Sequence, residues 1–186
     1  MNRAIFLDRD GVVIEEKNLK NIGMPGQPIT EPKHAELLPG VVKALKNLDN
    51  SYLKIIITNQ ANVGRGIITK ERLDEIHQKI LSELHDGNIK IDGIIYCPHK
   101  PEDNCKCRKP EIGMIKEAKK RYGLELSKCW IVGDATSDIK TGENAGMHTI
   151  LVRTGYGGRD KLFNVVPEYV VDNLDEAVKI INSCRS

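Results

Sequence analysis

Short apolar runs alternate along this chain with segments in which apolar residues recur every three or four positions. The runs are apolar on both faces, which is typical of strands buried in a parallel sheet, whereas the longer spacing is typical of helices with one buried face. Strands are therefore predicted at residues 4–7, 53–57, 91–96, 129–132 and 148–152, with a sixth candidate at 169–171. Helices are predicted at residues 41–48, 112–122, 137–145 and 174–181, and between the N-cap Thr69 and Gly87.

The regular alternation of strands and helices predicts an α/β fold, a doubly wound, Rossmann-like parallel sheet with helices on both faces. In such sheets, ligands bind beyond the carboxyl ends of the strands. Four residues with reactive side chains come directly after predicted strands or within two residues of one: Asp8, Thr58, Cys97 and Asp134. The topology is therefore expected to bring them to one edge of the sheet.

Length and composition indicate one globular domain. The 186 residues contain no internal repeat, 40% are hydrophobic and 29% are charged, so residues 1–186 are predicted to form a single domain with a long surface loop at 15–38. With 28 basic and 26 acidic residues, the chain offers no general electrostatic attraction for nucleic acid or anionic lipid. No apolar run approaches the ~20 residues of a membrane span, and no signal-peptide pattern precedes the first strand, so a cytoplasmic monomer is expected.

Two acidic clusters follow the first and fourth predicted strands. Asp8 and Asp10 stand just before Gly11, which lets the backbone turn sharply, and Asp134 and Asp138 open the segment after the fourth strand. Taken singly, these residues could form an Asp-Gly turn and a helix cap. Their positions after strands expected to be neighbours favour a shared site, because several carboxylates at one edge repel one another without a cation. Oxygen-only ligands favour Mg²⁺.

A second metal site is predicted in the loop after the third strand. Three cysteines and one histidine lie close together there: Cys97, His99, Cys105 and Cys107. Three thiolates and an imidazole complete a tetrahedral Zn²⁺ site with no open position, so the zinc is expected to be structural. Surface thiols beside an incidental histidine, or a catalytic Cys–His pair, are the alternatives. Arg108 and Lys109 follow the last ligand, so closing the loop would fix two cations beside the acidic edge. Cys129 is expected in the core and Cys184 is expected to be unliganded.

Taken in order, Asp8-x-Asp10-Gly11-Val12, Thr58 at a strand end, Lys109 and Gly133-Asp134-x3-Asp138 resemble the four motifs of the haloacid dehalogenase-like phosphatases. The resemblance covers residues 4–152 and implies an aspartyl-phosphate intermediate, with Asp8 as nucleophile and Asp10 as general acid and base. It implies Mg²⁺ bound by Asp8, the backbone carbonyl of Asp10, and Asp134. It also implies that Thr58 and Lys109 hold the phosphoryl oxygens, and that Asp138 orients Lys109 or a metal-bound water.

The zinc-loop segments Cys-Pro-His and Cys-x-Cys-Arg-Lys-Pro resemble a subgroup of this family that has no cap domain and acts on small molecules. It includes the D-glycero-D-manno-heptose 1,7-bisphosphate 7-phosphatases and the histidinol-phosphate phosphatases. Arg65-Gly66 and Arg153-Thr154-Gly155 are similar to the heptose enzymes, whereas the short gap between His99 and Cys105 is similar to the histidinol-phosphate enzymes. Two motifs against one favour a heptose bisphosphate as the small phosphorylated sugar substrate.

Residues that match Asn59, Gln60, Arg108 and Lys109 contact substrate in the heptose enzymes. Arg65 is a further candidate, for the second phosphate, and a solvated loop charge is the alternative there. Two features depart from the subgroup: the 15–38 loop is longer, and Ala135 stands where a heptose enzyme can carry lysine. A nucleic-acid 3′-phosphatase is disfavoured by the near-neutral charge and the 4% aromatic content. A non-enzymatic, zinc-stabilised binding module would leave the four motifs unexplained.

Overall fold

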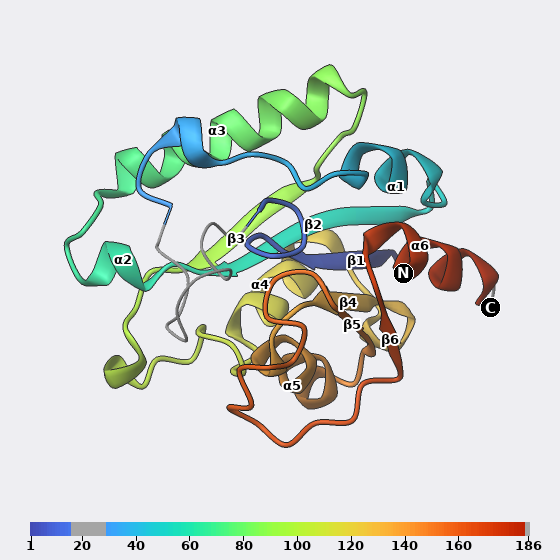
Figure 1. The fold of residues 1–186 in the computed structure, drawn as a ribbon. Helices are drawn as coiled ribbons and strands as arrows, with labels where there is room; N and C mark the ends of the chain where they lie inside the picture. Colours follow the sequence, from blue (N-terminus) through green and yellow to red (C-terminus); the bar gives the residue numbers. More distant parts are fainter. Residues whose placement is uncertain (16–28, 185–186) are drawn as a thin grey trace.

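The computed structural model describes residues 1–15 and 29–184, whose arrangement is shown in Figure 1. Six strands form one parallel sheet in the order β3-β2-β1-β4-β5-β6. They are β1 (Arg3–Asp8), β2 (Tyr52–Asn59), β3 (Gly93–Cys97), β4 (Trp130–Gly133), β5 (His148–Val152) and β6 (Tyr169–Val171). The predicted parallel sheet is confirmed, including its sixth strand. The strand order reverses between β1 and β4, and open α/β sheets bind ligands at such a switch point.

Helices cover both faces of this sheet (Figure 1). One face carries α1 (Val41–Asn47), α3 (Lys70–Asp86) and α6 (Leu174–Ser183), and the other carries α4 (Gly113–Tyr122) and α5 (Thr136–Ala145). A single turn, α2 (Ala61–Gly64), follows β2, and 3₁₀ turns occur at Pro32–His34, Pro101–Asp103 and Leu126–Lys128. None of the helices in the described segments combines the length and the apolar character needed to cross a bilayer.

Alternate residues of β1 point into two separate hydrophobic cores. Ile5 and Leu7 pack with the buried residues of α1, α3 and α6, whereas Ala4 and Phe6 pack with those of α4. All four side chains are fully buried, and burying each of the three larger ones stabilises the fold by about 2 kcal/mol. The apolar run predicted from the sequence is thus explained by burial on both faces, and it holds the residue that follows, Asp8, on a rigid support.

Element boundaries differ from the predictions in a few places. β3 begins at Gly93. At the preceding residue, the Asp92 N–H donates to the Lys54 carbonyl at 2.8 Å, but the Lys54 N–H donates to the Asp92 carboxylate at 2.9 Å, so a side chain replaces the backbone acceptor of a strand. The turn α2 was not predicted, since four residues are too few to show a helical period. The predicted N-cap is confirmed: the Thr69 hydroxyl accepts the Arg72 N–H at 3.1 Å.

Only part of the predicted loop at 15–38 lies within the described residues, because residues 16–28 fall outside them. Its later part packs against the turn that follows β1. The Glu15 N–H donates to the Glu36 carbonyl at 2.9 Å, Ile14 forms an antiparallel bridge with Leu37, and Ala35 is fully buried. This segment is therefore fixed next to the acidic turn.

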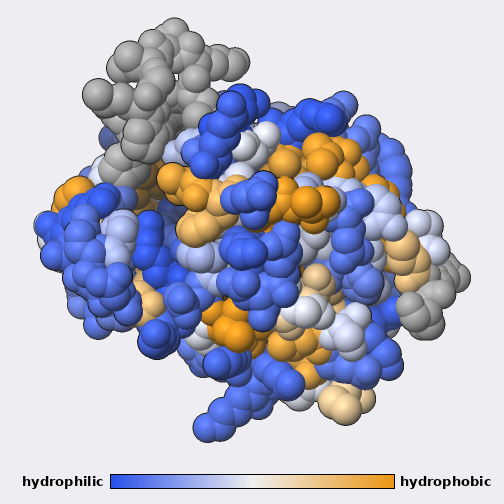
Figure 2. Space-filling view, turned by 90° about the horizontal axis from the view of Figure 1, so that it is seen from below, coloured by the Kyte–Doolittle hydropathy of each residue, from blue (hydrophilic) through white to orange (hydrophobic). Residues whose placement is uncertain are grey.

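On the molecular face shown in Figure 2, polar residues predominate and apolar residues gather in small patches.

Candidate active site

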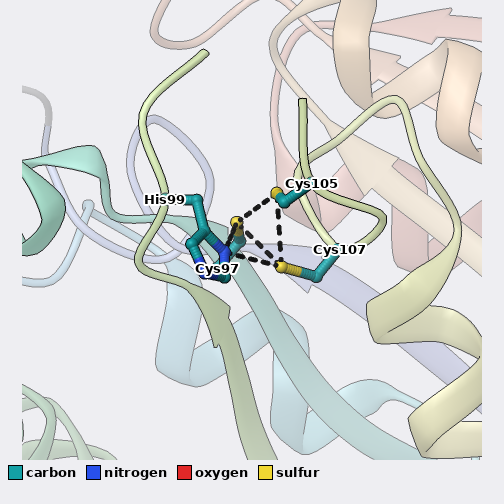
Figure 3. A group of neighbouring side chains, drawn as sticks. All are labelled: Cys97, His99, Cys105 and Cys107. Carbon is teal, nitrogen blue, oxygen red and sulfur yellow. Dashed lines mark hydrogen bonds between the residues drawn. The ribbon is translucent and has the colours of Figure 1, made fainter. Parts of the chain in front are cut away.

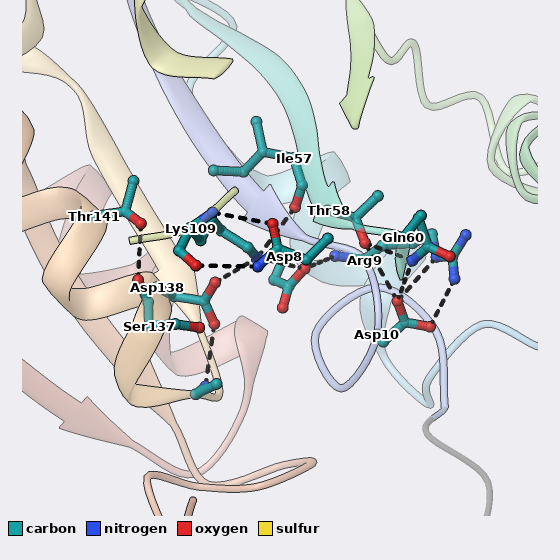
Figure 4. Close-up of polar contacts among 12 residues, drawn as sticks. Asp8, Arg9, Asp10, Ile57, Thr58, Gln60, Lys109, Ser137, Asp138 and Thr141 are labelled. Carbon is teal, nitrogen blue, oxygen red and sulfur yellow. Dashed lines mark hydrogen bonds and ion pairs between the residues drawn. The ribbon is translucent and has the colours of Figure 1, made fainter. Parts of the chain in front are cut away.

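The carboxyl ends of β1, β2 and β4 meet at one edge of the sheet, as predicted. Asp8 ends β1, Thr58 is the penultimate residue of β2, and Asp134 follows β4 directly. β1 pairs with β2 on one side and with β4 on the other, so the three residues converge. Lys109 enters from the loop after β3 and reaches the same edge (Figure 4). Residues far apart in the sequence thus form one compact charged cluster.

Lys109 is the cation at the centre of this cluster. Its ammonium group lies 2.9 Å from Asp8 Oδ1 and 2.5 Å from Asp138 Oδ1, and its side chain is 2% exposed. Burial alone would lower the pKa of Lys109, but the carboxylates of Asp138 and Asp8 outweigh burial and raise that pKa above its usual range. The lysine is therefore charged, and it is positioned to bind the oxygen atoms of an anion placed beside Asp8.

The Asp8 carboxylate carries an electrostatic penalty in this cluster. Burial and the nearby carboxylates of Asp138 and Asp10 raise the pKa of Asp8 to about 8, while Lys109 acts in the opposite direction. The backbone N–H of Arg9 donates to Asp8 Oδ1 at 2.7 Å, which fixes the orientation of the carboxylate. A bound cation would remove this penalty and keep Asp8 ionised, as a nucleophilic carboxylate requires.

The donor atoms of this edge fit a hard divalent cation. Carboxylate oxygens of Asp8, Asp134 and Asp138 all lie within 4.8 Å of one another. An all-oxygen set of this kind matches Mg²⁺, whereas a softer metal would call for nitrogen or sulfur. Asp138 is already committed to Lys109 and to the Ala135 N–H, which its Oδ2 accepts at 3.1 Å. Asp8 and Asp134 therefore remain the side chains best placed to bind the ion.

Asp134 is oriented by the segment that follows β5, a role that the sequence motifs did not predict. The Tyr156 backbone N–H donates to Asp134 Oδ2 at 2.6 Å, and the Thr154 hydroxyl donates to the Gly11 carbonyl at 2.6 Å. A Cβ atom at Gly11 or at Gly155 would overlap the Asp134 carboxylate, and both glycines have positive φ angles of 81° and 55°. The two glycines let both backbones approach the carboxylate closely, so Asp134 keeps one orientation.

The Asp10 carboxylate faces a different set of donors. Its Oδ1 accepts from Arg9 Nη2 at 3.0 Å, and its Oδ2 accepts from Arg9 Nε and from Gln60 Nε2, each at 3.1 Å. The Thr58 hydroxyl lies 3.4 Å from the same Oδ2 and accepts from Gln60 at 2.8 Å. The structure thus joins Asp10, Thr58 and Gln60, three of the predicted site residues, in one hydrogen-bonded group (Figure 4).

The remaining predicted substrate-binding residues occupy different positions. Asn59 binds the backbone of Lys109 on both sides, accepting its N–H at 3.0 Å and donating to its carbonyl at 3.3 Å. Arg108 Nη1 donates to the His99 carbonyl at 3.3 Å. Arg65 follows α2 and is exposed, and within the described part of the chain its side chain makes no ion pair. Asn59 therefore positions Lys109 here, and the substrate contact of Arg65 stays a prediction.

The predicted zinc ligands lie together on the loop after β3 (Figure 3). The Sγ atom of Cys107 lies 3.0 Å from Cys97 Sγ and 3.5 Å from Cys105 Sγ, and His99 Nδ1 lies 3.2 Å from Cys107 Sγ. Four bonds of ~2.3 Å in a tetrahedron would separate sulfur atoms by about 3.8 Å, so small adjustments suffice to enclose Zn²⁺. This ligand set fits a structural zinc ion.

Backbone groups favour the ionised form of one zinc-loop thiol. Burial opposes ionisation of Cys105, but the N–H groups of Arg108 and Cys107 stabilise the thiolate and lower the pKa of Cys105 to about 7. The loop therefore supplies a thiolate ligand near neutral pH and leads directly into Lys109. Cys129 is fully buried, as predicted, and its thiol donates to the Glu125 carbonyl at 3.3 Å.

Two features of the site were not predicted: the buried pair of Arg9 and His77, and the backbone donor of Tyr156. Arg9 stands between two acidic residues and is nevertheless 1% exposed, and its neighbour His77 is 5% exposed. The sequence offers one signal for His77, which falls on the same face of α3 as Leu73, Ile76 and Ile80. The backbone donor of Tyr156 has no signal in the sequence.

Comparison with known proteins places this arrangement among phosphatases. A profile of the HAD-hydrolase-like family matches residues 106–177. The D-glycero-beta-D-manno-heptose-1,7-bisphosphate 7-phosphatase of Haemophilus ducreyi is 34% identical, with 82% of this chain and 84% of the relative aligned. The histidine biosynthesis bifunctional protein of Actinobacillus pleuropneumoniae is 31% identical over 79% of this chain, but over only 39% of its own length.

A solved structure extends this similarity to the whole fold. The D,D-heptose 1,7-bisphosphate phosphatase of Bordetella bronchiseptica, crystallised with magnesium and phosphate, superposes with a TM-score of 0.85 at 30% sequence identity. The match covers 97% of this chain and 98% of that protein. The similarity therefore includes the carboxyl-end edge of the sheet, the later strands and the helices on both faces.

Proposed function

This chain belongs to the haloacid dehalogenase-like hydrolases, and we propose that it is a Mg²⁺-dependent phosphatase that hydrolyses the 7-phosphate of D-glycero-D-manno-heptose 1,7-bisphosphate. The observation that carries the proposal is the position of Asp8 at the end of β1, with Lys109 at 2.9 Å and with Asp134 and Asp138 beside it. This combination of a carboxylate nucleophile, a buried ammonium group and an oxygen-rich metal site suits phosphoryl transfer.

In the proposed reaction, an oxygen of Asp8 attacks the phosphorus atom and the bond to the sugar oxygen breaks. Asp10 donates a proton to that leaving oxygen, which departs as the sugar hydroxyl. The resulting aspartyl-phosphate then reacts with water, whose proton Asp10 accepts, and inorganic phosphate leaves while the Asp8 carboxylate is restored. Each carboxylate returns to its starting form after one turnover.

The other residues hold charge in place during both steps. Lys109 and the Thr58 hydroxyl would bind the oxygens of the transferring phosphoryl group, and Asp138 keeps Lys109 charged and directed at Asp8. Asp8, the backbone carbonyl of Asp10, and Asp134 would hold Mg²⁺. When bound, the ion supplies positive charge that offsets repulsion between the carboxylate and the phosphate. The proposed role of zinc is structural, because its four ligands leave no open position.

Two arginines on the loops that follow β2 and β3 support a substrate with a second phosphate. Arg65 is exposed near the end of β2, and Arg108 lies directly before Lys109. We assign these arginines, together with Asn59 and Gln60, to substrate binding. We further propose that the substrate is one small phosphorylated sugar and that the protein is a cytoplasmic monomer.

Histidinol phosphate is the competing substrate, because the gap between His99 and Cys105 is short and because bifunctional histidine-biosynthesis proteins are among the relatives. Initial rates of phosphate release from the two substrates, measured with Mg²⁺ and at low salt, decide between them. A higher kcat/KM for the heptose bisphosphate is expected, and a preference for histidinol phosphate would overturn the substrate. The Asp8→Asn variant should retain less than ~1% of the wild-type rate, and activity surviving in it would contradict the nucleophile.

A further inference from the structure

Arg9 is a buried cation that the proposed reaction leaves without a role. Its side chain is 2% exposed, and its guanidinium group binds both carboxylate oxygens of Asp10, at 3.0 and 3.1 Å. Two parallel N–H···O bonds of this kind fix the rotation of a carboxylate as well as its position. A lysine could supply the charge at this place but not the two-point geometry.

His77 in turn holds Arg9. Its Nε2 lies 3.3 Å from Arg9 Nη1, and the imidazole is buried on the inner face of α3. A guanidinium group has only donors, so His77 Nε2 must accept and its proton resides on Nδ1. Burial and the charge of Arg9 lower the pKa of His77 to about 4, which agrees with a neutral ring. The His77 ring packs against Tyr96 of β3 with centroids 5.6 Å apart, so the acceptor is anchored to the sheet.

We propose that Arg9 and His77 are positioning residues for acid–base catalysis: His77 fixes the Arg9 guanidinium, and Arg9 fixes the Asp10 carboxylate relative to the leaving oxygen. Neither residue touches the substrate in this proposal. The inference rests on the proposed phosphatase function and on Asp10 as its general acid. It adds a contact path from α3, through Arg9, to the group that transfers the proton.

The proposal predicts a dependence on the leaving group. A sugar alkoxide is a poor leaving group and requires protonation, whereas p-nitrophenolate leaves as a stable anion with little help from an acid. Loss of Asp10 positioning should therefore slow the first step, formation of the aspartyl-phosphate, far more with the sugar phosphate than with p-nitrophenyl phosphate, whereas the second step is the same for both substrates. Simple damage to the fold would slow both reactions by the same factor.

The experiment measures the rate of leaving-group release in a single turnover, which reports the first step alone, for the wild type and four variants on the heptose bisphosphate and on p-nitrophenyl phosphate, with Mg²⁺ present. Arg9→Met should lower this rate roughly 100-fold on the sugar substrate and less than about fivefold on the nitrophenyl ester. His77→Leu should lower the sugar rate about tenfold, and His77→Gln, which keeps an acceptor, should recover most of it. Arg72→Met, on the exposed side of α3, is the matched control and should behave like the wild type.

The outcomes separate this inference from the function on which it rests. Equal losses on both substrates, or full activity in Arg9→Met and His77→Leu, would overturn the positioning role. A wild-type protein that hydrolyses neither ester would contradict the phosphatase function itself. Should Arg9→Met fail to fold, as judged by circular dichroism, Arg9→Lys provides the same comparison. It keeps the charge and loses the two-point contact, so a substrate-dependent loss is again expected.

Discussion

Lys109 Nζ lies 2.5 Å from Asp138 Oδ1, and this ion pair is almost completely shielded from solvent, with side chains 2% and 0% exposed. The pair joins the loop that follows the zinc ligands to the start of α5. Removing one partner of a buried ion pair leaves an uncompensated charge, which is far more costly than losing a pair at the surface. The active-site cation is therefore also a structural element of the sheet edge.

We expect Asp138→Ala to lower the free energy of unfolding by about 2 kcal/mol and to lower kcat at least about tenfold, because Lys109 keeps only Asp8 as a carboxylate partner and the Ala135 N–H loses its acceptor. Urea unfolding and steady-state kinetics measure the two effects. Asp175→Asn is the control, since the Lys179–Asp175 pair at 2.6 Å lies on the surface. A loss of stability at Asp138 no greater than that at Asp175 would contradict the structural role.

A second prediction concerns the close approach of Gly155 to Asp134. A methyl group at residue 155 would overlap the Asp134 carboxylate, so Gly155→Ala should weaken Mg²⁺ activation at least about tenfold. Gly123→Ala is a matched control, because Gly123 also has a positive φ, of 64°, but open space at its Cβ. Both variants carry the backbone strain of about 1 kcal/mol. Only Gly155→Ala should shift the Mg²⁺ concentration needed for half-maximal activity, and equal Mg²⁺ dependence in the two variants would count against the proposed site.

The strands and the site residues at their ends were predictable, because burial on both faces leaves an unbroken apolar run and a parallel sheet gathers its carboxyl ends. Asp8, Thr58 and Asp134 lie where this reasoning expects them. Arg9 was not predictable, since a charged residue in a turn is normally solvated and its partner His77 is 68 residues away. A long-range side-chain contact of this kind leaves no period or spacing in the sequence.

Backbone contacts could not be predicted from the sequence for a different reason. The N–H group of Tyr156 orients Asp134, but every residue except proline offers the same donor. Asn59 has a further role that its motif position does not predict. Both polar atoms of its amide bind the Lys109 backbone, and its contact with substrate stays a prediction.

A third prediction tests the zinc loop. Cys105→Ser removes one of the four ligands, so we expect zinc content to fall from one ion per chain to well below half an ion. The melting temperature should drop by about 5 °C or more, because a structural zinc ion contributes folding energy. Cys184→Ser, outside the cluster, should retain full zinc content. Elemental analysis and thermal unfolding provide the measurements. A wild-type protein whose melting temperature does not change when its zinc is removed, or which contains no zinc as purified, would contradict the site.

The last prediction concerns pH and His77. The pKa of His77 is lowered to about 4 in the folded protein, against 6.5 for an unperturbed histidine, because the ring is buried and faces Arg9. Between pH 6.5 and about 4 the unfolded chain therefore binds a proton that the folded protein excludes, so folding stability falls as the pH falls through this window. The loss reaches about 3 kcal/mol near pH 4 and does not grow further below it.

His77→Gln isolates this contribution, because glutamine keeps an acceptor for Arg9 and does not titrate. The stability of the wild type relative to His77→Gln should be constant above about pH 7.5 and should decrease by about 2 kcal/mol or more between pH 7 and pH 4.5. Urea unfolding at a series of pH values measures this difference, in which all other titrating groups cancel. Parallel stability curves for the two proteins would contradict the lowered pKa of His77, and with it a neutral ring that accepts from Arg9.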